Sequence, residues 1–324
     1  MSYELDLWGK NRSQVDAANY RTQARQYDRE ALRLVITTDT IALYMQVLGF
    51  TERIRVAETN LGNAEEVLRI ITARYREGGV SALEVSQQKV EVNNIRAALT
   101  TLIAQRATTL NALAILLGQA PQNFGGPEAT LYSLKSPTVN LTPPTSLLTR
   151  RPDIQSIEAQ LYAANADIGA ARAAFLPSLQ LGTDTSLVAT GFGNPATAAL
   201  SLASNVLAPI FSGGRLEGNL ENVTARQKEL AAQYQQTILT AFREVEDALA
   251  IRKSTDQQAI LTKASVQEAR NAYTVAKARF DAGSIDYLTL LETQRSLSQA
   301  EDEQIIATVA QLEAFVQLRK ALGS

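Results

Sequence analysis

The passage Ala73-Arg74-Tyr75-Arg76-Glu77-Gly78-Gly79-Val80-Ser81-Ala82-Leu83 occurs a second time, far downstream, as Ala278-Arg279-Phe280-Asp281-Ala282-Gly283-Ser284-Ile285-Asp286-Tyr287-Leu288. Arginine, an aromatic residue, glycine and leucine recur at the same spacing. In both copies the glycine interrupts a very long helix-favouring pattern, which indicates an internal structural repeat. Long helices that fold back at two matched tips favour a structural device over an enzyme.

The composition excludes several chemistries. The 324 residues carry a net charge of −2 and contain neither cysteine nor histidine. Near-neutral charge gives no nucleic-acid footprint. Without cysteine and histidine there is no disulfide, no thiol nucleophile and no Ser-His-Asp triad, and the commonest transition-metal ligands are missing. A carboxylate-only site stays open, but no spacing indicates one. We therefore expect no enzyme, no cofactor, no metal site and no nucleic-acid partner.

The chain shows no obvious signal for a membrane or for export. No run approaches the roughly 20 apolar residues that a membrane-spanning helix needs. The N-terminal stretch Met1-Ser2-Tyr3-Glu4-Leu5-Asp6-Leu7-Trp8 lacks a basic segment followed by an apolar one. Read literally, this indicates a soluble protein that is not exported. The alternative is that the sequence begins inside a longer protein.

Two long helical hairpins dominate the predicted organisation. Residues 2–8 alternate between apolar and polar side chains, which predicts a half-buried strand. A proline-free helical pattern follows from Ser13 to Arg76, and such a helix would be on the order of 90–100 Å long. After the first tip a return helix reaches Leu117 and stops at Gly118, a plausible C-cap. The second return helix ends in the same way, at Leu322 and Gly323.

Apolar residues in both long helices follow the alternating three- and four-residue steps of a coiled coil. In the first half they are Ile54, Ala57, Leu61, Ala64, Leu68, Ile71 and Tyr75. In the second half they are Ala259, Thr262, Val266, Ala269, Tyr273, Ala276 and Phe280. An ordinary amphipathic helix is the alternative, but the shared phase favours antiparallel coiled coils. The small residues indicate close helix approach.

Between the two hairpins the pattern changes. Residues 119–145 are rich in proline, glycine and threonine and predict an irregular linker. A helix follows from Pro152 and stops at Pro177. Residues 178–188 and 199–211 then alternate in polarity, as membrane-barrel strands do. A soluble sandwich would show the same alternation, so both interpretations remain open here.

An aromatic residue ends each strand that leads into a long helix. Trp8 precedes Gly9, and Phe211 precedes Ser212 and two glycines. If the strands cross a membrane, Trp8 and Phe211 would lie at its interface, where aromatic residues are enriched. Simple packing at a strand–helix junction explains each aromatic equally well.

The residues at the joints of this order resemble those of the TolC-like outer membrane efflux protein family, most closely its lipoprotein, drug-efflux branch. The resemblance covers essentially the whole chain, and its most specific motifs are SYELDLWG at 2–9, LTRRPDI at 148–154, AANADIGAARAAFLPS at 163–178, PIFSGGR at 209–215 and YLTLLETQR at 287–295. It implies a mostly α fold in which long antiparallel coiled-coil helices form an α-barrel tunnel. A few strands per subunit would contribute to a trimeric membrane β-barrel.

The same resemblance implies a function. The protein would be a homotrimer in the outer membrane of a Gram-negative bacterium, in contact with its lipids and extending into the periplasm. It would be a passive exit duct for drugs or other small solutes, joined by a periplasmic adaptor (membrane fusion) protein to an inner-membrane RND-type transporter. A soluble coiled-coil scaffold or interaction protein, or a non-functional fragment of such a channel, are the alternatives.

The resemblance also defines three expected regions and one departure. Residues 1–118 form a first repeat, 119–145 an equatorial linker and 146–324 a second repeat. The family's export signal, N-terminal helix and first strand have no counterpart before the strand at 2–8, so we expect a truncated member. Three strands per subunit would leave a trimer with unpaired, lipid-exposed edges. We therefore expect that this chain alone does not form a normal channel.

The tips are the first candidate sites. By resemblance they form the periplasmic end and dock on the adaptor's hairpins. Gly78 and Gly283 permit the sharp turn. The remaining docking candidates are two arginines and four apolar residues: Arg74, Arg279, Val80, Leu83, Ile285 and Leu288. A purely structural role, a positive charge at a helix C-terminus, explains the arginines equally well.

The second candidate is a tunnel constriction. By resemblance, carboxylates just beyond the second tip line the narrowest ring of the closed tunnel. Glu292 matches one such position, and Thr289 occupies a neighbouring position where some members carry a second acid. Three glutamates around one axis would repel each other and bind cations. An exposed helical glutamate without a special role is the alternative, and the counterpart in the first copy is Gln87.

Overall fold

The computed structural model describes residues 2–134, 147–188 and 197–323. The chain divides into two compact units. The first comprises Met1–Leu32 and Pro143–Phe242, and the second comprises Arg33–Thr142 and Arg243–Ser324. Each unit is described by itself below.

The internal repeat is present in the backbone. Helix α1 spans Lys10–Arg76 and helix α5 spans Arg215–Asp281, and each has 67 residues. The return helices α2, Ala82–Leu116, and α6, Tyr287–Ala321, have 35 residues each. A single shift of 205 residues therefore superposes both boundaries of both helix pairs in the sequence. The mostly α fold with an internal repeat is confirmed.

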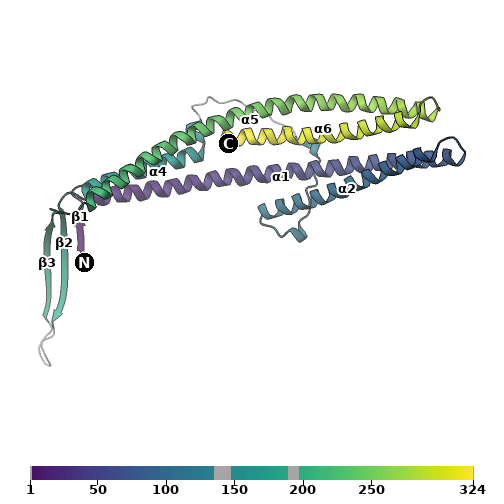
Figure 1. Ribbon diagram of the computed structural model, residues 1–324. Helices are drawn as coiled ribbons and strands as arrows, with labels where there is room; N and C mark the ends of the chain where they lie inside the picture. The colour runs from purple at the N-terminus through teal and green to yellow at the C-terminus, as the bar shows by residue number, and fades with distance from the viewer. Residues whose placement is uncertain (1, 135–146, 189–196, 324) are drawn as a thin grey trace. The chain divides into compact units, whose positions relative to one another are not determined.

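A three-stranded antiparallel sheet lies in the first unit (Figure 1). Its strands are β1, Ser2–Leu5, β2, Ser178–Val188, and β3, Thr197–Leu207, in the order β1-β2-β3. In the register, Ser2 pairs with Gly182, and Ser178 pairs with Leu207. The third strand is displaced from the predicted 199–211, since it begins and ends earlier in the sequence.

The first strand is shorter than the alternation of residues 2–8 predicts. It ends at Leu5 because the Asp6 carboxylate accepts hydrogen bonds from the backbone N–H groups of Asn11 and Arg12, at 3.0 and 2.8 Å. These are donors of the first helical turn that lack an intrahelical partner. Helix α1 consequently begins at Lys10, earlier than the predicted Ser13.

Two shorter helices also lie in the first unit. They are α3, Leu147–Arg150, and α4, Pro152–Ala173, and α4 begins with proline at its first position, as predicted. Helix α4 contacts the first part of α1: the Arg21 guanidinium pairs with Asp167 at 2.5 Å, and the Tyr20 and Tyr162 rings lie 5.5 Å apart.

In the second unit the two hairpins, α1/α2 and α5/α6, lie side by side (Figure 1). The described part of the linker contains two short 3-10 helices, η1, Pro121–Asn123, and η2, Leu131–Ser133. Leu131 is 1% exposed and joins a core cluster of α1 and α6, whose other buried members are Met45, Leu48, Ile305, Leu312 and Val316. The linker is thus anchored at Leu131, while residues 135–145 of the predicted linker lie outside the described residues.

The predicted coiled-coil positions face inward in part. Ala64, Ile71, Val266, Ala276 and Phe280 are buried, whereas Tyr75 is 48% exposed. The core also uses residues outside that seam, because α1 packs against the second hairpin as well as against α2. Helices α1 and α6 lie close together at a glycine: a Cβ added to Gly49 would lie 2.6 Å from Cγ2 of Val309.

Helix α1 contains one 18-residue stretch with a mean hydropathy of 1.3, of which 28% is buried. By length and composition it is apolar enough to cross a membrane, which differs from the expectation drawn from uninterrupted apolar runs. The sequence pattern missed it because polar residues such as Thr38 and Asp39 interrupt the stretch. One such helix is weak evidence for a membrane span, since a core helix passes the same test.

Candidate functional site at the hairpin tips

The two tips have the same backbone geometry. Gly78 has φ +79° and Gly283 has φ +71°, in the left-handed region that only glycine enters without strain. The Gly78 N–H donates to the Tyr75 carbonyl at 3.1 Å, and the Gly283 N–H donates to the Phe280 carbonyl at 3.0 Å. The repeated glycine therefore has a physical cause, because it ends each long helix by the same turn.

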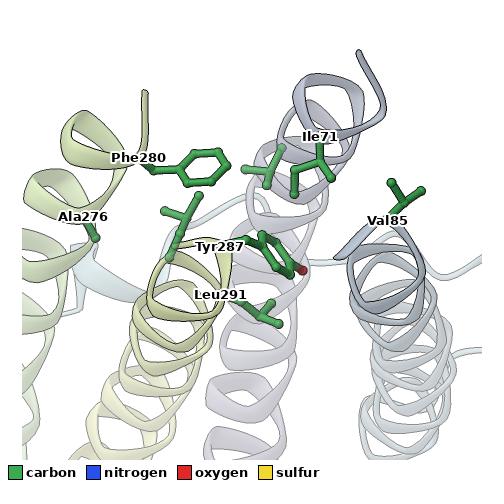
Figure 2. Packing of buried hydrophobic residues seen from close by; sticks show 8 residues of the cluster. Ile71, Val85, Ala276, Phe280, Tyr287 and Leu291 are labelled. Carbon is green, nitrogen blue, oxygen red and sulfur yellow. The ribbon is translucent and has the colours of Figure 1, made fainter. Parts of the chain in front are cut away.

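An apolar cluster from all four helices lies beneath the tips (Figure 2). Its buried members are Val67, Ile71, Val85, Ala276, Phe280, Tyr287, Leu290 and Leu291. Val80 and Ile285 are partly buried and pack against this cluster, whereas Leu83 and Leu288 are 65% and 50% exposed. Of the four apolar docking candidates, the two leucines are the ones that offer most of their side chain to another molecule.

A buried hydrogen-bond chain joins the two hairpins inside this cluster. Gln88 is 0% exposed; its Nε2 donates to the Ala64 carbonyl at 2.8 Å, and its Oε1 accepts from the Tyr287 hydroxyl at 2.7 Å. Burial raises the pKa of Tyr287 to about 12. Sequence reasoning missed Gln88, because a lone glutamine in a helix carries no pattern that distinguishes a buried from an exposed side chain.

Arg74 acts across the hairpins rather than at the end of its own helix. Its guanidinium donates to the carbonyl oxygens of Phe280 at 3.2 Å and Asp281 at 3.3 Å, the last residues of α5. It also lies 4.5 Å from the centroid of the Phe280 ring, a cation–π contact. Arg279, the matching residue of the second tip, is exposed, and its side chain contacts no partner among the described residues.

The start of α6 holds the constriction candidates. Asp286 caps the helix: its Oδ1 accepts from the Thr289 N–H at 2.9 Å and from the Thr289 hydroxyl at 2.6 Å. These bonds lower the pKa of Asp286. Thr289 thus serves the helix cap. Glu292 is exposed and pairs with no cation in the described part of the chain.

A shallow hollow of about 270 Å³ lies between α2 and α6 beside these residues. Its lining is formed by Ser86, Gln87, Val90, Leu288, Leu291 and Arg295. Arg295 reaches across to Glu91 of α2, where its Nε donates to the carboxylate at 2.7 Å. The side chains around the second tip therefore combine exposed apolar, acidic and paired basic groups without a catalytic arrangement.

The two interface aromatics lie in the first unit. Trp8 is 52% exposed, and its indole N–H donates to the Pro177 carbonyl at 2.7 Å, just before β2. Phe211 is 90% exposed. Trp8 therefore has a structural partner, whereas Phe211 presents most of its ring to the surroundings.

Nothing in the described ranges is arranged to hold a metal: these residues contain no group of three or more histidine, cysteine, aspartate or glutamate side chains with suitable geometry. The pairs of charged residues near the tips, such as Arg295 with Glu91, link helices to each other.

Comparisons with known proteins agree on one family. A family profile described as outer membrane efflux protein matches residues 1–119 and 144–324. The pyoverdine export outer membrane protein OpmQ of Pseudomonas aeruginosa is 39% identical over 326 residues, which cover 99% of this chain and 68% of that protein. The toluene efflux pump outer membrane protein TtgF of Pseudomonas putida is 33% identical, covering 100% of this chain and 68% of that protein.

Solved structures give the same result. A membrane protein from Pseudomonas aeruginosa superposes with a TM-score of 0.92 at 32% identity, covering 99% of this chain and 75% of that one. The outer-membrane channel OprN superposes with a TM-score of 0.91 at 26% identity, covering 99% and 73% of the two chains. The sheet and both hairpins are thus shared with these proteins.

Proposed function

Because the chain belongs to the outer membrane efflux protein family, we propose that it is one subunit of a homotrimeric channel-tunnel, a passive exit duct for solutes that an inner-membrane RND-type transporter supplies. A periplasmic adaptor would connect the two. The outer-membrane location and the role as an efflux channel rest on the family. The similar protein OprN is an outer-membrane channel, and we propose that this chain likewise is a channel subunit and not an enzyme.

The single observation that carries the proposal is the extent of the match, which includes the strands as well as the helices. The sheet also favours a membrane over the soluble scaffold alternative. Leu202 and Val206 of β3 are 78% and 69% exposed, and Tyr3 of β1 is 66% exposed. Apolar side chains that stand out from a sheet suit contact with lipid, whereas a soluble sheet would cover them.

For the tips, Glu292 and the two interface aromatics we propose the roles that the resemblance implies. The tips at Gly78 and Gly283 are proposed to dock on the adaptor, with Leu83 and Leu288 as the exposed apolar contacts. Glu292 is proposed to form the constriction ring, since its carboxylate is exposed and unpaired in the described part of the chain. Trp8 and Phe211 are proposed to lie at the membrane interface.

The regions are proposed to be a first repeat (1–118), an equatorial linker (119–145) and a second repeat (146–324). The relatives' names mention pyoverdine in one case and toluene in another. Since these compounds differ in size and polarity, we propose that the duct is permissive and that the transporter selects the solute.

The test compares two forms of the protein: the full-length product of the native gene and residues 1–324 alone. Each is produced in a Gram-negative host that lacks its own efflux channel, together with a compatible adaptor and transporter. The full-length product is expected in the outer-membrane fraction as a trimer and should restore drug resistance. Residues 1–324 alone are expected to give no stable conductance, because the three strands that the structure describes would leave sheet edges unpaired in a trimer. A soluble full-length product would contradict the proposal.

A further inference from the structure

The two tips use their matching arginines differently. Arg74 of the first tip binds the carbonyl oxygens of Phe280 and Asp281, at the C-terminal end of α5. Arg279 occupies the same place in the second tip. Its side chain is exposed and makes no hydrogen bond, ion pair or ring contact with the residues that the structure describes. The arginine of the first tip therefore donates hydrogen bonds, whereas the arginine of the second tip has no acceptor within the described part of the chain.

The acceptor ends show the opposite asymmetry. Phe280, beneath the Arg74 guanidinium, is 3% exposed, whereas its counterpart Tyr75 is 48% exposed. The Phe280 carbonyl accepts from both Gly283 N–H and Arg74, while the Tyr75 carbonyl accepts from Gly78 N–H alone among the described groups. A carbonyl oxygen has two lone pairs, so one acceptor position on Tyr75 is open.

The unpaired Arg279 guanidinium and the open acceptor position on the Tyr75 carbonyl complement each other. We propose that the Arg279 side chain of one copy of this chain binds the C-terminal end of α1 in the next copy. There it donates to the carbonyl oxygens of Tyr75 and Arg76 and lies over the Tyr75 ring. The contact repeats the one that Arg74 makes within a chain. A head-to-tail contact of this kind forms a closed ring when the rotation between copies closes, as it does in a trimer. The inference rests on the homotrimer proposed above and names a residue contact of its interface.

Helix electrostatics support the same contact. The last carbonyl groups of an α-helix lack intrahelical partners and carry partial negative charge, so a guanidinium at that end is favourable. An arginine over an aromatic ring adds cation–π attraction. The first interaction requires only the main-chain carbonyl groups at a helix end, and the second requires only an aromatic ring. Both tips have these groups.

The side faces of α1 and α5 provide an independent observation. Val56 and Ile70 of α1 are partly buried, because they pack against the core clusters that α1 forms with the second hairpin. Their counterparts at the 205-residue shift, Leu261 and Val275 of α5, are 59% and 52% exposed. At these two positions α5 is therefore apolar and uncovered within the chain, where α1 is covered. A neighbouring copy would cover them in the same way.

One difference makes the proposed contact weaker than its intrachain counterpart. Arg76 stands where the second tip has Asp281, so Arg279 would approach a like charge. The bonds run to main-chain oxygens, which the side-chain type does not change. Glu77, whose counterpart is Ala282, supplies a carboxylate at the next position. These charged side chains are exposed and therefore screened by salt, so we expect the strength of the contact to depend on the salt concentration.

Residues 1–324 contain no cysteine, which permits a direct test in the full-length protein by paired cysteines and a short bis-maleimide. Arg279→Cys with Arg76→Cys is the proposed contact. Arg74→Cys with Asp281→Cys is the matched control, since it is the same pair of positions within one chain. The first pair should yield covalently linked dimers and trimers on denaturing gels. The control pair should give only cross-links within a single chain, which leave the protein at the monomer position on the gel.

The outcomes separate this inference from the function it rests on. If native mass measurement finds a trimer but the Arg279→Cys and Arg76→Cys protein links only within monomers or not at all, the inference is overturned and the trimer stands. If no trimer is found, both fail. As a second measurement, Arg279→Ala and Tyr75→Ala should each lower the detergent concentration at which trimers dissociate, and the double variant should lower it no further than the stronger single one. Fully additive shifts would argue against a direct contact.

Discussion

Replacing Gly49 by alanine tests how closely α1 and α6 pack. The added Cβ would lie 2.6 Å from Cγ2 of Val309, about 1 Å inside the 3.5–4.0 Å at which carbon atoms normally rest. Val309 cannot swing aside easily, because a β-branched side chain in a helix has one strongly preferred rotamer. The helices must therefore separate locally, and overpacking of this kind costs about 1–3 kcal/mol.

The opposing term comes from helix propensity. Alanine in a helix interior is favoured over glycine by about 1 kcal/mol. Gly49→Ala should therefore destabilise the protein by about 0–2 kcal/mol net. Gly62 supplies the matched control in the same helix, since a Cβ added there has no atom within 4 Å. Gly62→Ala should stabilise by up to about 1 kcal/mol, so the gap between the two variants isolates the overpacking cost.

The measurement is the thermal unfolding midpoint of the full-length protein in detergent, followed by circular dichroism. We expect the order Gly62→Ala, wild type, Gly49→Ala, from most to least stable. Adding Val309→Ala to Gly49→Ala should remove the clash, so the double variant should lose less stability than the two single changes added together. A Gly49→Ala protein as stable as Gly62→Ala would refute the argument from close approach.

Three further predictions concern α6. Burial raises the pKa of Tyr287 to about 12, so its neutral phenol contributes fully to stability below about pH 10 and loses that contribution as the pH rises toward 12; Tyr287→Phe should flatten this part of the pH–stability curve, and an unchanged slope would contradict the assignment. Both amide atoms of Gln294 are buried without a partner in the described structure, so Gln294→Leu should raise the unfolding midpoint by an amount equivalent to about 1–3 kcal/mol, whereas a lower midpoint would show that the amide is satisfied. Glu292→Ala should reduce cation block and cation preference of single trimeric channels in a planar bilayer, while Glu303→Ala, an exposed change on the same helix, should leave both as they are; equal behaviour of the two variants would remove Glu292 from the constriction.

The sequence predicted the elements whose cause is local. A glycine at positive φ, a proline at the first position of α4 and strict polarity alternation each leave a mark on neighbouring residues, so tips, helices and strands were found. The predictions were wrong where a side chain that is distant in sequence, or outside any periodic pattern, determines the end of an element. Asp6 ended β1 early through bonds to the next helix, and the displaced β3 had no distinct boundary signal in its alternation.

The candidate site shows the same division. Gly78 and Gly283 were recognised from the repeat, because the turn itself demands them. The partner of Arg74 was not, since the arginine reaches the other hairpin and sequence spacing carries no information on that contact. Gln88 was missed for a related reason: its bonds run to one residue on α1 and one on α6.

The repeat therefore preserves contacts within a hairpin better than contacts between hairpins. Glu65 pairs with Arg96 at 2.6 Å in the first hairpin, and at the same shifted positions Arg270 pairs with Glu301 at 2.8 Å, with the charges exchanged. A charge exchange keeps the attraction only if both positions change together, so the geometry of each hairpin constrains its own pairs. Contacts between hairpins have no such symmetry, because the first hairpin meets the second within the chain. One side of the second hairpin corresponds to the covered side of the first. Its arginine and its exposed apolar residues have no partner within the described chain, and we propose that a neighbouring copy contacts them.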